Sequence, residues 1–81
     1  MNVKVKFFAI ARDLVGKDEM LLSLPEHAST TTVIDKLIER FPKFQDWKPY
    51  IRIAVNYEYV PQDHKLKDND EIAIIPPVSG G

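Results

Sequence analysis

The order of two hydrophobic periodicities along the chain limits the folds open to it. Near the start, Val3, Val5 and Phe7 alternate with charged residues, which is typical of a strand with one buried face. A helical period occurs over residues 33–41, and alternation returns over residues 51–56 and 71–75. A chain of 81 residues has room for one domain. The pattern therefore predicts a single α+β domain.

The individual elements follow from the same pattern. We expect strands at residues 3–10, 19–24, 51–56 and 71–75, and a short one at 59–60. Residues 11–17 and 43–50, with Gly16 and Pro49, are expected to be irregular connections. Thr32 and Asp35 fit the pattern of a capped helix start, and Pro42 ends the helix. Asn69 is expected to take a left-handed conformation in a turn at residues 67–70.

This order of strand, strand, helix and two or three further strands is that of the β-grasp, or ubiquitin-like, fold. We expect a mixed sheet of four to five strands with one main helix packed on one face. The first and last strands are expected to pair in parallel at the centre of the sheet. The β-grasp domain then covers residues 1–75, and residues 76–81 form an extended tail.

Composition excludes several classes of function. The net charge of −1 comes from interleaved acidic and basic residues, so we expect no nucleic-acid partner. No apolar run approaches the ~20 residues of a membrane span, and the absence of cysteine is compatible with a cytoplasmic protein. His27 and His64 are the only histidines and have no recognised ligand spacing, so we expect no metal site. No nucleophile, base and orienting group occur together, so the chain is not expected to be an enzyme alone.

The C-terminal segment, Pro76-Pro77-Val78-Ser79-Gly80-Gly81, has a composition that suits insertion into a narrow channel. The prolines hold the backbone extended, and the glycines leave the tip without side chains. A carboxylate on Gly81 is sterically bare, so it can be adenylated and then attacked by sulfur, giving a thiocarboxylate, or by an amine, giving an amide. The alternative is a disordered end that happens to contain glycines.

Two blocks of the sequence resemble the small subunit of molybdopterin synthase, the MoaD family of the MoaD/ThiS-type sulfur carriers. The first runs from Phe7 to Gly16 (FFAIARDLVG), and the second comprises Ala54-Val55-Asn56, residues 66–73 and the PPVSGG ending. The resemblance spans the chain. Asn69 departs from the glycine usual in the family, at a position where Asn tolerates the same backbone angles.

The resemblance implies a sulfur carrier that binds no cofactor or metal. An E1-like enzyme would adenylate Gly81 with ATP, and a sulfurtransferase would convert the adenylate to a thiocarboxylate, a C-terminal 1-thioglycine. The tail would then insert into the large synthase subunit, in a heterotetramer, where catalysis takes place. There the sulfur would pass to cyclic pyranopterin monophosphate in molybdenum cofactor biosynthesis.

Strand alternation predicts a docking surface beside this tail. Phe8 and Ile75 are expected to face outward on neighbouring strands, with Tyr59 nearby. Arg12 belongs to the first resembling block and is expected to pair with an acidic partner. Alternatively, the apolar residues form a small secondary core under a loop, and Arg12 is a solvated surface side chain.

Two other functions remain open. One is a sulfur carrier for thiamin or cysteine synthesis. The PPVSGG tail and the FFA block with its arginine argue against this function. The other is a ubiquitin-like modifier conjugated through Gly81 to lysines. Ladders of conjugates in a lysate would indicate the modifier, whereas one free species with a stable large partner would indicate the synthase subunit.

Overall fold

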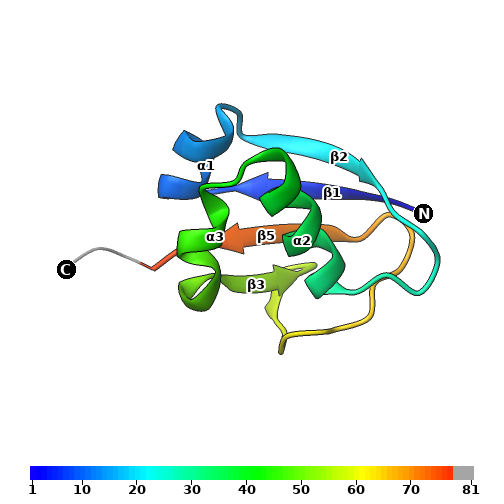
Figure 1. The fold of residues 1–81 in the computed structure, drawn as a ribbon. Helices are drawn as coiled ribbons and strands as arrows, with labels where there is room; N and C mark the ends of the chain where they lie inside the picture. The colour runs from blue at the N-terminus through cyan, green and yellow to red at the C-terminus, as the bar shows by residue number, and fades with distance from the viewer. Residues whose placement is uncertain (78–81) are drawn as a thin grey trace.

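A computed structural model describes residues 1–77, so residues 78–81 of the tail lie outside the described part. The chain forms a five-stranded mixed sheet in the order β2-β1-β5-β3-β4. Figure 1 shows the sheet with the helices in front of it. The elements are β1 (Asn2–Phe7), α1 (Ala9–Val15), β2 (Glu19–Ser23), α2 (Thr30–Arg40), α3 (Phe44–Trp47), a 3₁₀ turn (Lys48–Tyr50), β3 (Arg52–Val55), β4 (Glu58–Tyr59) and β5 (Glu71–Ile75).

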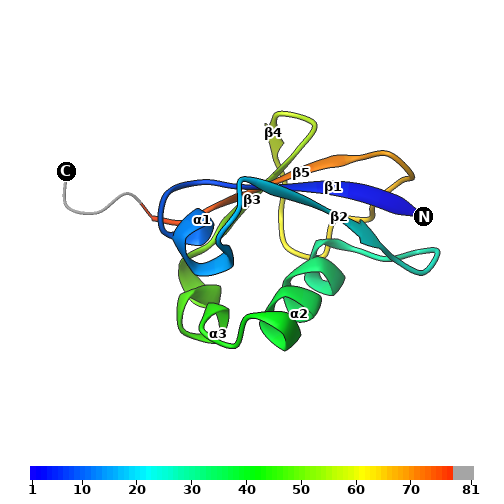
Figure 2. The same ribbon diagram turned by 90° about the horizontal axis from the view of Figure 1, so that it is seen from above.

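The topology confirms the predicted β-grasp fold. β1 and β5 pair in parallel, with Val5 opposite Ile72, and β1 pairs with β2 as the expected antiparallel neighbour. On its other side β5 pairs antiparallel with β3, so the last strand is the middle strand of the sheet. α2 and α3 lie on one side of the sheet, and β4 curls toward the other (Figure 2). Among residues 1–77, no helix covers this second side, which we call the open face.

The core lies between the sheet and α2. Side chains predicted to face inward on β1 and β5 are almost completely buried: Val3, Val5, Phe7, Ile72 and Ile74. α2 contributes Val33, Ile34 and Leu37 to the core, whereas Ile38 and Phe41, which were predicted to share one helical stripe with Ile34 and Leu37, are only partly buried. Each such side chain stabilises the fold by about 1.5–3 kcal/mol when fully buried. The alternation in the sequence therefore identifies the two faces of the sheet correctly.

The predicted start of the main helix was wrong by three residues. Ser29 is the N-cap, and its backbone N–H donates to the Thr32 side-chain oxygen at 3.1 Å. The Ser29 hydroxyl donates to the Asp63 carboxylate at 2.9 Å, and Thr30 accepts the His64 N–H at 3.2 Å. Contacts with the β4–β5 connection, which is distant in the sequence, thus stabilise a helix start earlier than the predicted one. A local sequence pattern cannot reveal such contacts.

Both predicted connections contain helices. α1 spans seven residues and buries only Ala11, so its apolar stripe is too short to show a period; Gly16 ends it at φ +84°. In the other connection, Phe44 of α3 is fully buried, and its ring lies 6.4 Å from those of Phe7 and Phe41. Phe44 is therefore part of the core. Figure 1 places α1 and α3 at the end of the sheet where β5 ends.

The turn before β5 has the predicted left-handed residue, Asn69, at φ +69°. It directs Asp70 inward, where the carboxylate accepts hydrogen bonds from the Asn56 side chain (2.9 Å) and the Lys67 N–H (2.8 Å). The side-chain amide oxygen of Asn56 in turn accepts the Glu71 N–H at 3.0 Å. These bonds fix the start of the strand that leads to the tail.

Candidate functional site

The tail leaves the sheet from its middle strand. Ile72 and Ile74 of β5 are fully buried between β1 and β3, so the strand is held on both sides. Pro76 is also buried, whereas Pro77 is exposed. The predicted functional residues Val78, Ser79, Gly80 and Gly81 lie outside the described residues. The base of the tail is therefore held firmly by the sheet.

An apolar depression surrounds the base of the tail. Its lining residues come from the β1–α1 junction, α3 and the end of β5: Phe8, Ala9, Ile10, Trp47, Ile75, Pro76 and Pro77. Phe8 is 48% exposed, and Ile75 is half-buried. A large exposed phenyl group among apolar neighbours is typical of a contact surface for another protein. We call this surface the tail-base patch.

The structure brings together two of the four predicted docking residues. Phe8 follows the last residue of β1, and Ile75 is the last residue of β5, so parallel pairing places both at the same end of the sheet. Ala9 takes φ +51° directly after Phe8, a conformation that costs an L-residue roughly 1–2 kcal/mol. This backbone turns the chain from the strand into α1 and leaves the Phe8 ring on the surface.

Tyr59 does not line the tail-base patch. It lies on β4 opposite Ala54, and the Arg52 guanidinium is 4.6 Å from the centre of its ring. Arg52 is the partner of Ile75 in the β3–β5 ladder, so it lies between Tyr59 and the end of β5. Tyr59 therefore lies beyond Arg52 on the open face, where it is 61% exposed.

Arg12 projects from α1 beside Phe8. Both residues line a second shallow depression together with Lys6, Asp18 and Glu19. The Arg12 guanidinium lies 3.6 Å from the Asp18 carboxylate, and both side chains are well exposed. Such a pair contributes little to stability, so Arg12 can exchange Asp18 for an acidic group on a partner at low cost.

Sequence reasoning missed Trp47 as a site residue. It falls in the segment that was expected to be an irregular connection, but its half-buried indole lines the tail-base patch together with Phe8 and Ile75. The signal was the only tryptophan of the chain next to an apparent loop. Recognising it required knowing that α3 packs at the same end of the sheet as the tail.

The described residues offer no other candidate for chemistry. Among residues 1–77, no three His, Cys, Asp or Glu side chains gather closely enough to hold a metal ion. Within the same range, no helix has the length and apolar character needed to cross a bilayer. Among the described residues, the candidate site is the tail-base patch.

The sequence matches the model of a known protein family. The model of the ThiS family matches residues 5–81. The chain belongs to the ThiS family. A curated relative of this ThiS-family chain, the molybdopterin synthase sulfur carrier subunit of Dictyostelium discoideum, is 43% identical over 96% of this chain and 94% of its own.

Solved structures of similar proteins agree with the fold. A putative molybdopterin converting factor, subunit 1, from Pyrococcus furiosus is 40% identical, with a TM-score of 0.85 over 96% of this chain and 99% of its own. The small archaeal modifier protein 1 of Methanosarcina acetivorans is 33% identical, with a TM-score of 0.81 over 99% of this chain and 96% of its own. The ThiS-family domain is thus similar both to sulfur carriers and to a protein modifier.

Proposed function

We propose that this chain is the sulfur-carrier small subunit of molybdopterin synthase. The observation that carries the proposal is its similarity, over nearly the full length, to curated sulfur carrier subunits of that enzyme. The fold supports it, because the middle strand of the sheet leads directly into the tail whose last residue would carry the sulfur.

The chemistry of the proposal takes place at Gly81. An E1-like enzyme transfers AMP from ATP to the glycine carboxylate and releases pyrophosphate. A sulfurtransferase then delivers sulfur as sulfide, whose attack on the acyl carbon displaces AMP and leaves a thiocarboxylate. Because Gly81 has no side chain, the acyl carbon is open to both attacks. The chain binds no resident cofactor in this scheme, and its only modifications are the transient adenylate and 1-thioglycine.

The partner of the proposed reaction is a large synthase subunit. The tail-base patch docks against it, with Phe8 and Ile75 buried in the contact and Arg12 paired to an acid at its rim. Residues 76–81 enter the large subunit, which binds cyclic pyranopterin monophosphate and performs the catalysis. Two small subunits and a dimer of large subunits form a heterotetramer. We place the reaction in the cytoplasm, where the activating enzyme has ATP.

A mass measurement tests the proposal. The full chain is incubated with the activating enzyme, ATP and a sulfur source, and its intact mass and C-terminal peptide are recorded. We expect a species in which one oxygen of Gly81 is replaced by sulfur. The converted protein, mixed with the large subunit and the pterin precursor, should yield molybdopterin. Failure to form the sulfur species under these conditions contradicts the carrier function.

A second function is a protein modifier conjugated through Gly81. The similarity to the archaeal modifier, at 33% identity over nearly the whole chain, favours it. Both functions need the adenylate, so they differ in the attacking group, which is sulfur in one case and a lysine amine in the other. Expression of a tagged chain in its own cells separates them. Conjugate ladders that disappear when Gly81 is deleted indicate a modifier, and one free species indicates a carrier.

A further inference from the structure

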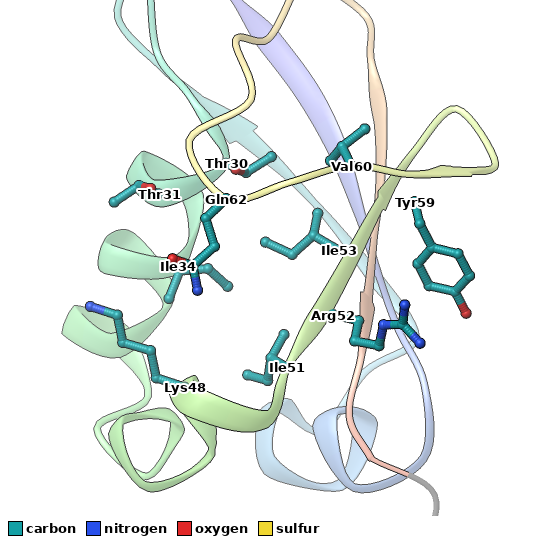
Figure 3. Close-up of a pocket in the computed structure, with 10 residues that line it drawn as sticks. All are labelled: Thr30, Thr31, Ile34, Lys48, Ile51, Arg52, Ile53, Tyr59, Val60 and Gln62. Atoms are coloured by element: carbon teal, nitrogen blue, oxygen red, sulfur yellow. The ribbon is translucent and has the colours of Figure 1, made fainter.

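A third hollow lies between α2 and β3. It measures about 310 Å³ and is shown in Figure 3. Its floor consists of Ile34, Ile51, Ile53 and Val60. None of these residues lines the tail-base patch, so the two surfaces are separate. We call this hollow the β3 groove.

The β3 groove runs along a stretch of strand edge that has no partner. β4 pairs only with Ala54 and Val55, and the Val60 N–H then bonds to the Ile53 carbonyl oxygen at 3.1 Å. The backbone groups of Arg52 alternate with those of Ile53 and face Ile75 of β5, and among residues 1–77 no strand pairs with the next residue on this side, Ile51. A free edge of this kind is a template for pairing with another extended chain.

Side chains on both sides of the sheet border this free edge. Ile51 and Ile53 point toward α2, whereas Arg52 and Tyr59 point to the opposite side (Figure 3). Successive side chains of an added strand would alternate between the same two sides. One set of its side chains would therefore meet the apolar floor, and the other set would lie beside Arg52 and Tyr59.

The charges along the groove favour an acidic occupant. Lys48 and Arg52 are its only charged lining residues, and no carboxylate lines it. The one carboxylate paired with them is Asp35, whose oxygen is 3.7 Å from the Lys48 ammonium group. The Arg52 guanidinium, stacked on Tyr59, has no acid partner among the described contacts. Acidic side chains on the outer side of an added strand would supply one.

We propose that the β3 groove binds a segment of a partner protein in which apolar and acidic residues alternate, as an added strand on the edge of β3. The apolar side chains pack on Ile34, Ile51 and Ile53, and the acidic side chains face Arg52. The proposal is independent of the carrier function, because it uses no residue of the tail or of the tail-base patch.

The test uses the ¹⁵N-labelled full chain and a blocked seven-residue peptide of alternating valine and glutamate. We expect saturable shifts of the amide signals of residues 51–53 and 60–62. Replacing every glutamate of the peptide by lysine should abolish them. Only one alternate set of peptide N–H groups can face the edge. Of two analogues methylated on alternate amide nitrogens, one should therefore lose at least tenfold in affinity and the other should bind almost as well as the parent.

Matched variants of the chain complete the test. Lys48→Gln with Arg52→Gln should weaken binding of the glutamate peptide about five- to tenfold, because it removes both cations that line the groove. Lys36→Gln with Arg40→Gln makes the same charge change on the other flank of α2, beside Leu21 and Leu22 of β2, and should have no effect. The proposal would be overturned if the two double variants lost equal affinity, or if both methylated analogues bound equally well. Shifts that map to β2, or the lack of any saturable shift, would also overturn it.

Discussion

Phe7 of β1 lies opposite Ile74 of β5 in the parallel ladder at the centre of the sheet, and both side chains are almost completely buried. This pair sets the position of the residue that follows it on each strand. Phe8 and Ile75 follow it, and both line the tail-base patch. One pairing thus connects the packing of the core to the surface at the base of the tail.

The Phe7–Phe8 dipeptide offers a direct stability comparison. Phe7→Ala should lower the free energy of unfolding by about 3–5 kcal/mol, because it leaves a cavity between β1 and Phe44. Phe8→Ala should cost less than about 1 kcal/mol, because the ring is 48% exposed. Urea denaturation followed by far-UV circular dichroism measures both. Similar losses in the two variants would show that Phe8 belongs to the core.

A second comparison tests docking at the tail-base patch. Phe8→Asp or Ile75→Asp should weaken the complex with the large subunit or the activating enzyme roughly a hundredfold, because an unpaired carboxylate becomes buried in the contact. Leu21→Asp is the control: Leu21 is 73% exposed on β2, away from the tail. Calorimetric titration measures the affinities. Normal binding by the two patch variants, or their unfolding, would refute the docking role.

The sequence predicted the strands and the central helix well, because their apolar residues repeat at regular intervals over several positions. β1 and β5 show clear alternation, so their inward faces, their pairing and the left-handed Asn69 could be predicted. α1 and α3 span seven and four residues, which is too short for a helical period to be recognised. Tertiary packing alone shows that Phe44 is buried.

The candidate site was predicted in part for the same reason. Alternation places Phe8 and Ile75 outward, and parallel pairing brings them together. Trp47 joins them only because α3 folds back to the same end of the sheet. Tyr59 was expected near the tail, but β4 carries it to the far side of Arg52. Such positions depend on how short connections turn, which residue patterns do not specify.

The β3–β4 turn should become more stable when Tyr57 is replaced by glycine. Asn56 and Tyr57 form the two-residue connection at φ +51° and +72°, where glycine is the usual second residue. The Tyr57 side chain is 86% exposed, so little packing is lost. Tyr57→Gly should raise the free energy of unfolding by about 0.5–1 kcal/mol. Tyr59→Gly, which removes the contact with Arg52, should lower it, and thermal denaturation distinguishes the two outcomes.

The buried carboxylate of Asp70 should contribute more to the free energy of unfolding than the carboxylate of Asp68. Asp70→Ala removes the acceptor for the Asn56 side chain and the Lys67 N–H, so the free energy of unfolding should fall by about 1–3 kcal/mol. Asp68 accepts one exposed bond from the Asn2 N–H, and Asp68→Ala should cost less than about 1 kcal/mol. Equal effects in urea denaturation would mean that the Asp70 bonds are not what fixes the start of β5.

The length of the tail should be critical for sulfur transfer and irrelevant to folding. Deleting Gly81, or adding one residue after it, moves an extended tip by ~3.3 Å. A misplacement of about 1 Å can cost on the order of a hundredfold in rate, because the acyl carbon must reach a substrate held by the partner. Both variants should therefore fail to make molybdopterin.

Chemically thiocarboxylated variants isolate this step, because they need no activation. They are combined with the large subunit and the pterin precursor, and the rate of molybdopterin formation is compared with that of the unaltered chain. Their thermal unfolding should match the unaltered chain, since the strands that bury Ile72 and Ile74 are untouched. The control is Ser79→Ala, which keeps the length of the tail and should retain most of the rate of molybdopterin formation. A chain lacking Gly81 that transfers sulfur at the normal rate would exclude a mechanism in which the tip is positioned by tail length.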